Sequence, residues 1–509
     1  MRFFIIVSLL LIQMILGVML ASAIVLNFVV LVYVGIAISI IAFLSILKND
    51  QAAIYKMTWV IVVLAMLPFG GFFYLLFGNQ RATRRIKTHM QEHALIAKLL
   101  DSDGNLLSSD QSQTQPQTRH GRIYSLFRYI RQASSYHAYN NTQTKYYAFG
   151  EAMFADMLAA LDKAEKFIFL EFFIIAKSSM WDQILEILVQ KAEAGVDVRL
   201  IADDLGSQKL FTNAYIAELR SRKLKVLRFN PMTPFLFSFM NHRGHRKILV
   251  TDGHTAFCGG LNIADEYINV KERFGVWKDT GLRLRGDAVW SYTLMFIETW
   301  DTFCRKDERI NDYAAYKYDF NGHDSSLSDG FVLPYGDTPL DKERLGENIY
   351  IDILNQAEHY VYIFTPYLII SEIMIQALKM AAQRGVDVRI VTPGIPDKKL
   401  VYRLTRSYYQ YLLVAGVRIY EYTPGFLHAK SFVSDDKVAI VGTINLDYRS
   451  LYLHFECATL LYNADTIRHI KEDAQKTITQ SREVLPIKRK WRVFGELTDA
   501  VLHLFAPIV

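Results

Sequence analysis

The 509-residue chain is poor in cysteine and has no C-x-x-C pair. Its three cysteines, Cys258, Cys304 and Cys457, are an odd number, which does not suit a disulfide framework and indicates reduced thiols in a cytoplasmic domain. The 13 histidines include no H-E-x-x-H or other metal-ligand spacing. We therefore expect no metal and no cofactor.

Charged residues are absent from the start of the chain, since residues 3–47 contain none. A membrane-spanning helix needs about 20 apolar residues, so this run is long enough for two, and Met57–Phe77 is a further candidate. The first run is too long for the apolar core of a cleaved signal peptide. The sequence thus predicts two or three transmembrane helices within residues 1–80.

A basic cluster, Arg81, Arg84, Arg85 and Lys87, follows the last apolar stretch. Lys and Arg beside a span favour the cytoplasmic side, which predicts a multi-pass membrane protein whose later part is cytoplasmic. Residues 1–100 carry eight basic and two acidic residues, which accounts for the whole net charge of +6. The balanced remainder argues against a nucleic-acid partner. Residues 81–139 are predicted to be a basic juxtamembrane segment and linker, because 101–120 is rich in Ser, Gln and Asp.

An internal repeat begins near residue 140. AEKFIFLEFFII is followed by a helical stretch and AEAGVDVRLIADD, and AEHYVYIFTPYLII is followed by a helical stretch and AQRGVDVRIVTPG. Each copy reads strand, helix, Gly turn, strand, which is typical of a β-α-β unit with two parallel strands. The repeat predicts two pseudo-symmetric α/β halves, at 140–325 and 326–509.

A second repeat carries the chemistry. HRKILVTDGHTAFCGGLN and HAKSFVSDDKVAIVGTIN share the frame H-x-K-x4-D-x6-G-x2-N at a constant offset of 183 residues. The first copy holds His245, Lys247, Asp252, Gly259 and Asn262, and the second holds His428, Lys430, Asp435, Gly442 and Asn445. Two copies of a five-residue spacing are very unlikely to arise by chance.

The residue types of the frame suit a phosphodiester. If both stretches are strands, the His and Lys of each copy share one face. Imidazole suits nucleophilic and acid–base work near neutral pH, and an ammonium and an amide can bind phosphate oxygens. The pairs Gly259-Gly260 and Gly442-Thr443 are expected to let a phosphate approach backbone N–H groups. Two such faces would surround one phosphate without a metal.

The doubled motif resembles the phospholipase D superfamily. GGLNIADEY, FGVWKDT, FLHAK and GTINLDYRS extend the resemblance to bacterial cardiolipin synthases over nearly the whole chain. This resemblance implies two phospholipase D-like halves, each a mixed β-sheet flanked by helices, with the active site at their interface. It places Asp252 and Asp435 with the site, although at strand ends they are expected to hold loops. It also supplies Asp279 and Glu456 as acceptors that orient the two imidazoles.

The family implies transfer of a phosphatidyl group between two phosphatidylglycerols, giving cardiolipin and glycerol in a bacterial cell membrane. By the same resemblance, His245 is the nucleophile, forming a phosphohistidine, and His428 is the acid–base; Asn262 and Asn445 bind phosphate. Pseudo-symmetry allows the two histidines to swap. Hydrolysis by water, another phosphatidyl acceptor, a nuclease and a non-catalytic lipid-binding protein remain alternatives. The oligomeric state is left open.

Two apolar segments have two interpretations each. The stretch Phe235–Met240 before the first motif is either a lipid-facing lip or buried core. The C-terminal segment has apolar residues at helical spacing, which suits either an interfacial helix or a helix that caps the domain. Its apolar positions are Trp491, Phe494, Leu497, Val501, Leu504 and Phe505.

Overall fold

The computed structural model describes residues 11–19, 29–49, 53–78, 86, 88–90, 92, 121–231, 242–320, 330–341, 343–486 and 502–503. Four of the predicted segments lie wholly or mostly outside these residues. They are the basic cluster at 81–87, the linker at 101–120, the Phe235–Met240 stretch and the C-terminal apolar segment.

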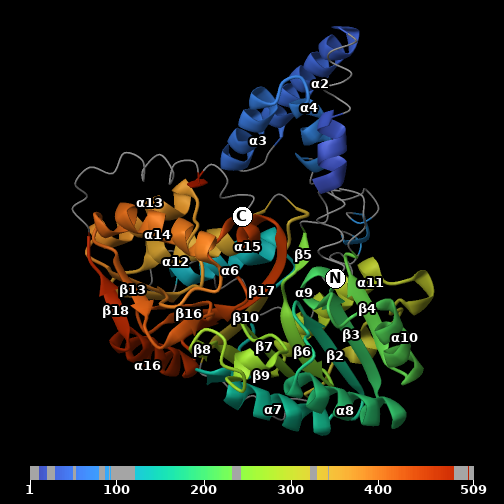
Figure 1. Ribbon diagram of the computed structural model, residues 1–509. Coiled ribbons are helices and arrows are strands. Elements are labelled where there is room, and N and C mark those ends of the chain that lie inside the picture. Colours follow the sequence, from blue (N-terminus) through green and yellow to red (C-terminus); the bar gives the residue numbers. More distant parts are fainter. Residues whose placement is uncertain are drawn as a thin grey trace.

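The N-terminal part is helical and stands apart from the two sheets in Figure 1. Its elements are α2 (Val29–Lys48), α3 (Ala53–Ala65), α4 (Gly70–Phe73) and the π-helix η1 (Tyr74–Gly78). Among the described residues, no helix reaches both the length and the apolar character of a membrane span. The transmembrane helices predicted for residues 1–80 also cover 1–10, 20–28, 50–52 and 79–80, which lie outside the described residues.

The first half is built on a seven-stranded sheet of order β1-β9-β7-β6-β2-β3-β4. The parallel strands β2, β3 and β4 lie at one side, and the other neighbours are antiparallel. The strands are β1 (Thr142–Tyr147), β2 (Phe167–Phe172), β3 (Asp197–Asp203), β4 (Lys225–Phe229), β6 (Lys247–Thr251), β7 (Thr255–Gly259) and β9 (Gly281–Gly286).

The second half repeats this order as β10-β17-β16-β15-β11-β12-β13, with β18 added at the edge. The predicted β-α-β unit is present in both halves, because β2 pairs in parallel with β3 and β11 pairs in parallel with β12. The strands are β10 (Phe331–Asp337), β11 (Tyr360–Phe364), β12 (Asp387–Pro393), β13 (Arg418–Tyr422), β15 (Ser431–Ser434), β16 (Val438–Gly442), β17 (His454–Tyr462) and β18 (Ser481–Val484).

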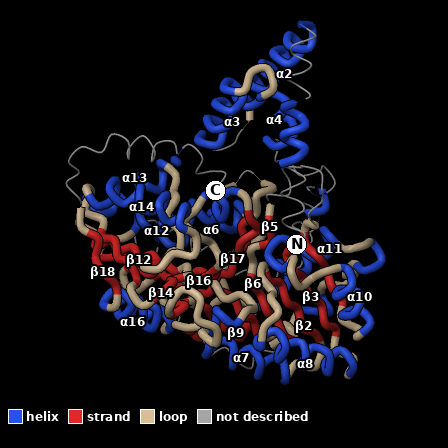
Figure 2. Tube along the Cα trace, in the orientation of Figure 1, coloured by secondary structure: helices blue, strands red, loops and turns tan. Residues whose placement is uncertain are grey.

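Helices cover the outer face of each sheet, so the molecule is layered (Figures 1 and 2). The first sheet carries α7 (Gly150–Asp162), α8 (Ser179–Glu193) and α10 (Asn213–Ser221), and the second carries α6 (Gly121–Ala133), α12 (Leu345–Gln356), α13 (Glu372–Gln383) and α14 (Lys399–Leu413). The helix α6 falls within residues predicted as linker. Its apolar face, with Ile123, Phe127 and Ile130, packs on the second half, which is why this stretch is ordered.

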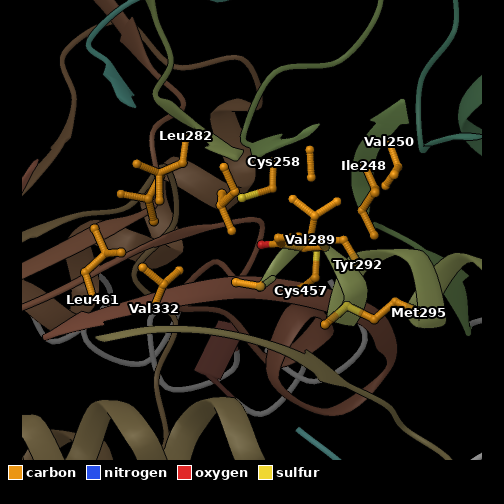
Figure 3. Packing of buried hydrophobic residues seen from close by; sticks show 14 of the residues in the cluster. Ile248, Val250, Cys258, Leu282, Val289, Tyr292, Met295, Val332, Cys457 and Leu461 are labelled. Atoms are coloured by element: carbon orange, nitrogen blue, oxygen red, sulfur yellow. The ribbon is translucent and has the colours of Figure 1, made fainter. Parts of the chain in front are cut away.

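The inner faces of the two sheets share one hydrophobic core with α11 (Val289–Phe303) and α16 (Thr466–Thr479). Figure 3 shows Cys258 of β7, Cys457 of β17 and Tyr292 of α11 within it. The Tyr292 hydroxyl lies 2.7 Å from the Thr459 hydroxyl, which also lies 3.5 Å from Cys258 Sγ. The three cysteines are unpaired, as expected. Because this core is continuous, the two halves form one body.

Smaller elements connect these layers. They are α9 (Asp204–Ser207), β5 (Arg243–Gly244), η4 (Asp265–Ile268), β8 (Val276–Lys278), η5 (Lys306–Glu308), η6 (Ala314–Tyr316), β14 (Gly425–Leu427) and α15 (Tyr448–Tyr452). Of the C-terminal segment, Leu502 and His503 are described and helical, and the His503 ring stacks on Tyr408 of α14.

Candidate active site

The His-Lys pairs of the two motifs lie where one short strand ends and the next strand begins. His245 follows β5 and precedes β6, which begins at Lys247; His428 follows β14, and Lys430 precedes β15. The prediction that both residues of each pair lie within one strand was wrong, because His245, His428 and Lys430 lie between strands, whereas Lys247 is the first residue of β6. At each His-Lys pair the chain passes from a short strand, β5 or β14, to a strand of the larger sheet, β6 or β15.

Each short strand pairs with the opposite half. β5 of the first half pairs in parallel with β17 of the second, and β14 of the second pairs in parallel with β8 of the first. The N–H of His245 donates to the Phe455 carbonyl at 2.9 Å, and the N–H of His428 donates to the Lys278 carbonyl at 2.8 Å. These two strand pairs between the halves hold both histidines at the interface of the halves.

The same two strand pairs place each imidazole next to a carboxylate of the other half. Nδ1 of His245 lies 2.8 and 2.9 Å from the two oxygens of Glu456, and Nδ1 of His428 lies 2.6 Å from Asp279. A carboxylate only accepts hydrogen bonds, so both Nδ1 atoms carry the hydrogen. Each Nε2 then has a free lone pair, which a nucleophile or a general base requires. The structure thus places Asp279 and Glu456 where the sequence analysis expected them.

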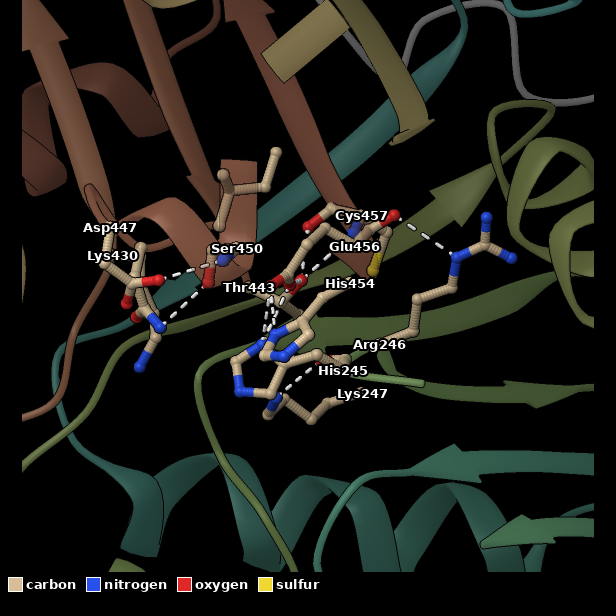
Figure 4. Close-up of polar contacts among 12 residues, drawn as sticks. His245, Arg246, Lys247, Lys430, Thr443, Asp447, Ser450, His454, Glu456 and Cys457 are labelled. Carbon is tan, nitrogen blue, oxygen red and sulfur yellow. Dashed lines mark hydrogen bonds and ion pairs between the residues drawn. The ribbon is translucent and has the colours of Figure 1, made fainter. Parts of the chain in front are cut away.

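The carboxylates are themselves held rigidly. The Thr443 hydroxyl donates to Glu456 (Figure 4), and the Thr280 N–H donates to Asp279 at 2.9 Å. A Cβ at Gly260 would lie 1.9 Å from the Asp279 carboxylate, so only glycine fits there. Thr443 and Gly260 occupy equivalent positions, at the 183-residue offset. Thr443 therefore holds Glu456 in the second half, and Gly260 leaves the space that Asp279 occupies in the first half.

Burial and the lysines keep both imidazoles neutral. Burial, followed by the Lys430 ammonium, lowers the pKa of His428 to about 4 against the opposing effect of Asp279. Burial and the Lys247 ammonium lower the pKa of His245 well below its usual range. Both rings are therefore neutral at neutral pH, with their single N–H hydrogen on Nδ1.

The lysines are buried and held beside their own histidines. Lys247 Nζ donates to the His245 carbonyl at 2.5 Å, and Lys430 Nζ donates to the His428 carbonyl. Burial lowers the pKa of Lys247 to about 8 and that of Lys430 to about 7. A bound anion would restore their charge, so the pair is suited to a phosphate.

The motif aspartates bind backbone and face away from the histidines. The Asp252 carboxylate accepts the N–H groups of residues 165, 166 and 167 at 2.7 to 2.9 Å. Asp435 accepts those of residues 358, 359 and 360 at 2.7 to 2.9 Å. Both aspartates adopt positive φ angles, 53° and 51°. Each one ties the turn after its own strand to the start of the neighbouring antiparallel strand, β2 or β11.

The motif asparagines are buried. Nδ2 of Asn262 donates to the Tyr267 hydroxyl at 2.8 Å, and Nδ2 of Asn445 donates to the Ser450 hydroxyl at 3.0 Å. Each amide nitrogen has a second hydrogen that these bonds do not use. In the described residues, Asn445 Oδ1 has no partner.

The expected backbone phosphate contacts were wrong. The N–H groups of Gly260, Gly442 and Thr443 donate to carbonyls of residues 280, 430 and 457 at 2.8 to 3.2 Å. Because these groups are already used between strands, they are not available to a phosphate. Small residues are needed here for the close approach of side chains and strands.

Sequence reasoning missed His454, which lies beside His245 with a ring-centroid distance of 5.3 Å. In the described part of the chain, one group of side chains has ligand atoms close enough for a metal, namely His245, His454 and Glu456, within 4.8 Å of one another. The Nδ1–H of His245 already donates to Glu456, and a metal would have to replace this bond. The strand alternation of LHFE, which puts His454 and Glu456 on one face, was the available signal.

The comparisons with known proteins match both halves and the N-terminal part. A family model described as "Cardiolipin synthase, PLD-like domain" matches residues 157–279 and 350–478, and one described as "Phospholipase_D-nuclease N-terminal" matches 37–79. A cardiolipin synthase of Geobacillus kaustophilus is 36% identical, covering 94% of this chain and 93% of that protein. One of Alkalihalophilus pseudofirmus is 32% identical, covering 89% and 88%.

An uncharacterized protein of Streptococcus mutans is 43% identical over 92% of this chain and 99% of its own length. Among solved structures, phosphatidylserine synthase of Haemophilus influenzae superposes with a TM-score of 0.53 at 15% identity. The superposition covers 72% of this chain and 93% of that one, and it shows that the two proteins have a similar fold. Both His-Lys-Asp copies fall inside the matched blocks, and relatives above 30% identity align over 89% of the chain or more. The protein is therefore a member of the cardiolipin synthase family, phosphatidyltransferases with the phospholipase D-like domain.

Proposed function

We propose that this enzyme makes cardiolipin and glycerol from two molecules of phosphatidylglycerol through a phosphohistidine. One observation carries the proposal: two neutral imidazoles, each fixed by a buried carboxylate of the opposite half, have their Nε2 atoms free. This arrangement suits a two-step displacement at one phosphorus.

In the first step, His245 Nε2 attacks the phosphorus of one phosphatidylglycerol. The N–P bond forms as the bond from phosphorus to the glycerol oxygen breaks. His428, which takes up a proton when the anionic substrate raises its pKa, gives that proton to the leaving glycerol. Glu456 stabilises the positive charge that develops on the His245 ring.

In the second step, His428 removes the proton from a hydroxyl of the second phosphatidylglycerol. That oxygen attacks phosphorus, the P–O bond forms and the P–N bond to His245 breaks, which restores both residues. Lys247 and Lys430, with the free amide hydrogens of Asn262 and Asn445, stabilise the negative oxygens in both steps.

The test uses purified protein in vesicles of phosphatidylglycerol, with a chelator present. We expect free glycerol and an equal amount of a lipid with two phosphates and four acyl chains. Glycerol with phosphatidic acid would mean that water is the acceptor, and the synthase proposal would fail. His428→Ala and His245→Ala should each lower turnover by about 10³-fold or more.

A second measurement addresses the intermediate. With phosphatidylglycerol labelled in its phosphate, the protein should become labelled through an acid-labile bond. The label should be absent from His245→Ala. Labelling of that variant but not of His428→Ala would mean that the two roles are exchanged.

We also propose that the N-terminal helices hold the enzyme in the bacterial cell membrane, with the two sheets on the cytoplasmic side. In α2, large apolar side chains are exposed, including Tyr33, Ile41 and Leu44 at 68%, 65% and 58%. Such a surface is suited to lipid. Protein released from membranes by salt or carbonate would contradict insertion, and protease access to the sheets from outside intact cells would contradict the orientation.

A further inference from the structure

The two histidine sites are built alike, so their differences stand out. Glu456 and Asp279 hold His245 and His428, and each acid lies two residues after an aromatic side chain, Glu456 within β17 and Asp279 directly after β8. Beside Glu456 this residue is His454, and beside Asp279 it is Trp277. The two therefore occupy equivalent positions.

Strand register and ring distances agree with this equivalence. His454 pairs with Arg243, two residues before His245, and Trp277 pairs with Phe426, two residues before His428. The His454 and His245 ring centroids are 5.3 Å apart, and those of Trp277 and His428 are 5.4 Å apart. One imidazole thus has a second imidazole for its neighbour, while the other has an indole.

The ring nitrogens of His454 make no hydrogen bond to any of the described residues. The His454 side chain is 10% exposed. The nearest acceptor is Glu456, whose oxygen lies 3.6 Å from Nδ1 and is engaged by His245. Burial lowers the pKa of His454 to about 3, so the ring is neutral and offers one donor and one acceptor. Buried polar groups without a partner cost free energy and call for an explanation.

We propose that His454 is a substrate-binding residue, which donates a hydrogen bond to an oxygen of the lipid phosphoglycerol held at His245. This proposal rests on the proposed function, because it assumes that a phosphodiester enters between the two catalytic imidazoles. The acceptor is either a non-bridging phosphate oxygen or a hydroxyl of the headgroup glycerol. Trp277 Nε1 is also buried without a partner among the described residues, but an indole N–H can only donate, whereas the His454 ring can donate and accept.

The test compares His454→Phe, which keeps a ring without polar atoms, with His454→Gln, which keeps a donor and an acceptor. In phosphatidylglycerol vesicles, we expect His454→Phe to lose about tenfold or more of kcat/KM. His454→Gln should stay within about threefold of wild type. The control is His469→Leu, at an exposed histidine of α16, which should not change kcat/KM.

Phosphatidylethanol as donor, with free glycerol as acceptor and ethanol release as the readout, identifies the oxygen, because the headgroup of this donor has no hydroxyl. The same loss for His454→Phe with both donors would assign a phosphate oxygen, and a loss confined to phosphatidylglycerol would assign a glycerol hydroxyl. Either result supports the proposal. Should His454→Phe not fold, His454→Leu takes its place with the same expected loss.

The proposal is overturned if a folded His454→Phe or His454→Leu keeps wild-type kcat/KM, or if His454→Gln is folded but as impaired as they are. Failure of the proposed function is a separate result: the wild-type enzyme would then release no glycerol from phosphatidylglycerol, or would release it with phosphatidic acid in place of cardiolipin.

Discussion

At the scale of single residues, the site depends on two carboxylates that need never touch substrate. Glu456 and Asp279 fix the tautomers of His245 and His428, and both acids are fully buried. A buried, hydrogen-bonded acid keeps its position when the imidazole changes charge. The four residues therefore work as two pairs.

Replacing either acid by its amide should impair the chemical step. We expect Glu456→Gln and Asp279→Asn to lower kcat by about 10²- to 10⁴-fold, because an amide can hold the ring in the wrong tautomer. KM should change much less. The measurement is steady-state glycerol release, with thermal unfolding as the control for folding. A change in KM alone would mean that the acids act on binding.

Substrate binding should weaken as pH rises. The pKa values of Lys430 and Lys247 are lowered to about 7 and 8, so both ammonium groups lose their protons between pH 6 and 9 in the free enzyme. Loss of positive charge disfavours an anionic phosphodiester. KM, measured in uncharged detergent micelles, should thus rise over this range. A flat profile would show that the lysines stay charged.

At the scale of secondary structure elements, each motif aspartate ties one turn to the next strand. Asp252 and Asp435 directly follow β6 and β15, and each carboxylate accepts three backbone N–H groups at the start of β2 or β11. The two aspartates therefore occur at the same position in both motif copies because the fold around the site needs them there, and not because they contact substrate.

Removal of one of these carboxylates should lower the free energy of unfolding. Asp252→Ala loses three charge-assisted hydrogen bonds and places alanine at a φ of 53°, so we expect a loss of about 3 kcal/mol in urea unfolding. Asp252→Asn should lose less, because asparagine keeps one acceptor and tolerates this φ. Glu472→Ala, at an exposed pair with Arg468, should change stability by about 0.5 kcal/mol or less. Equal losses for Ala and Asn would contradict this account.

At the scale of the whole molecule, the two halves complete each other. His245 receives its carboxylate from the second half and His428 receives its carboxylate from the first, and the sheets share one core through α11. Neither half holds a complete imidazole–carboxylate pair. The active site is thus a property of one folded chain.

This organisation predicts no complementation between chains. A mixture of His245→Ala and His428→Ala protein, co-expressed and purified together, should be no more active than either alone. The measurement is glycerol release from phosphatidylglycerol vesicles. Recovery toward half of the wild-type rate would instead mean that motifs from two chains meet.

The sequence by itself determined the doubled frame, its residues and the repeated β-α-β unit, because a constant spacing and strand alternation are local properties of the chain. It also placed Asp279 and Glu456, through the resemblance, but not the half that each one serves. That was decided by tertiary structure, since the pairing of β5 with β17 and of β8 with β14 joins segments about 200 and 150 residues apart, which no local pattern encodes.

Only the fold could decide the remaining corrections. The N–H groups of Gly260 and Gly442 turned out to be bonded between strands, and the histidines turned out to lie at strand ends, because both depend on register across sheets. His454 gains its place beside His245 in the same way. A residue's type and spacing state what chemistry it can do, whereas its partners depend on which distant strand lies next to it.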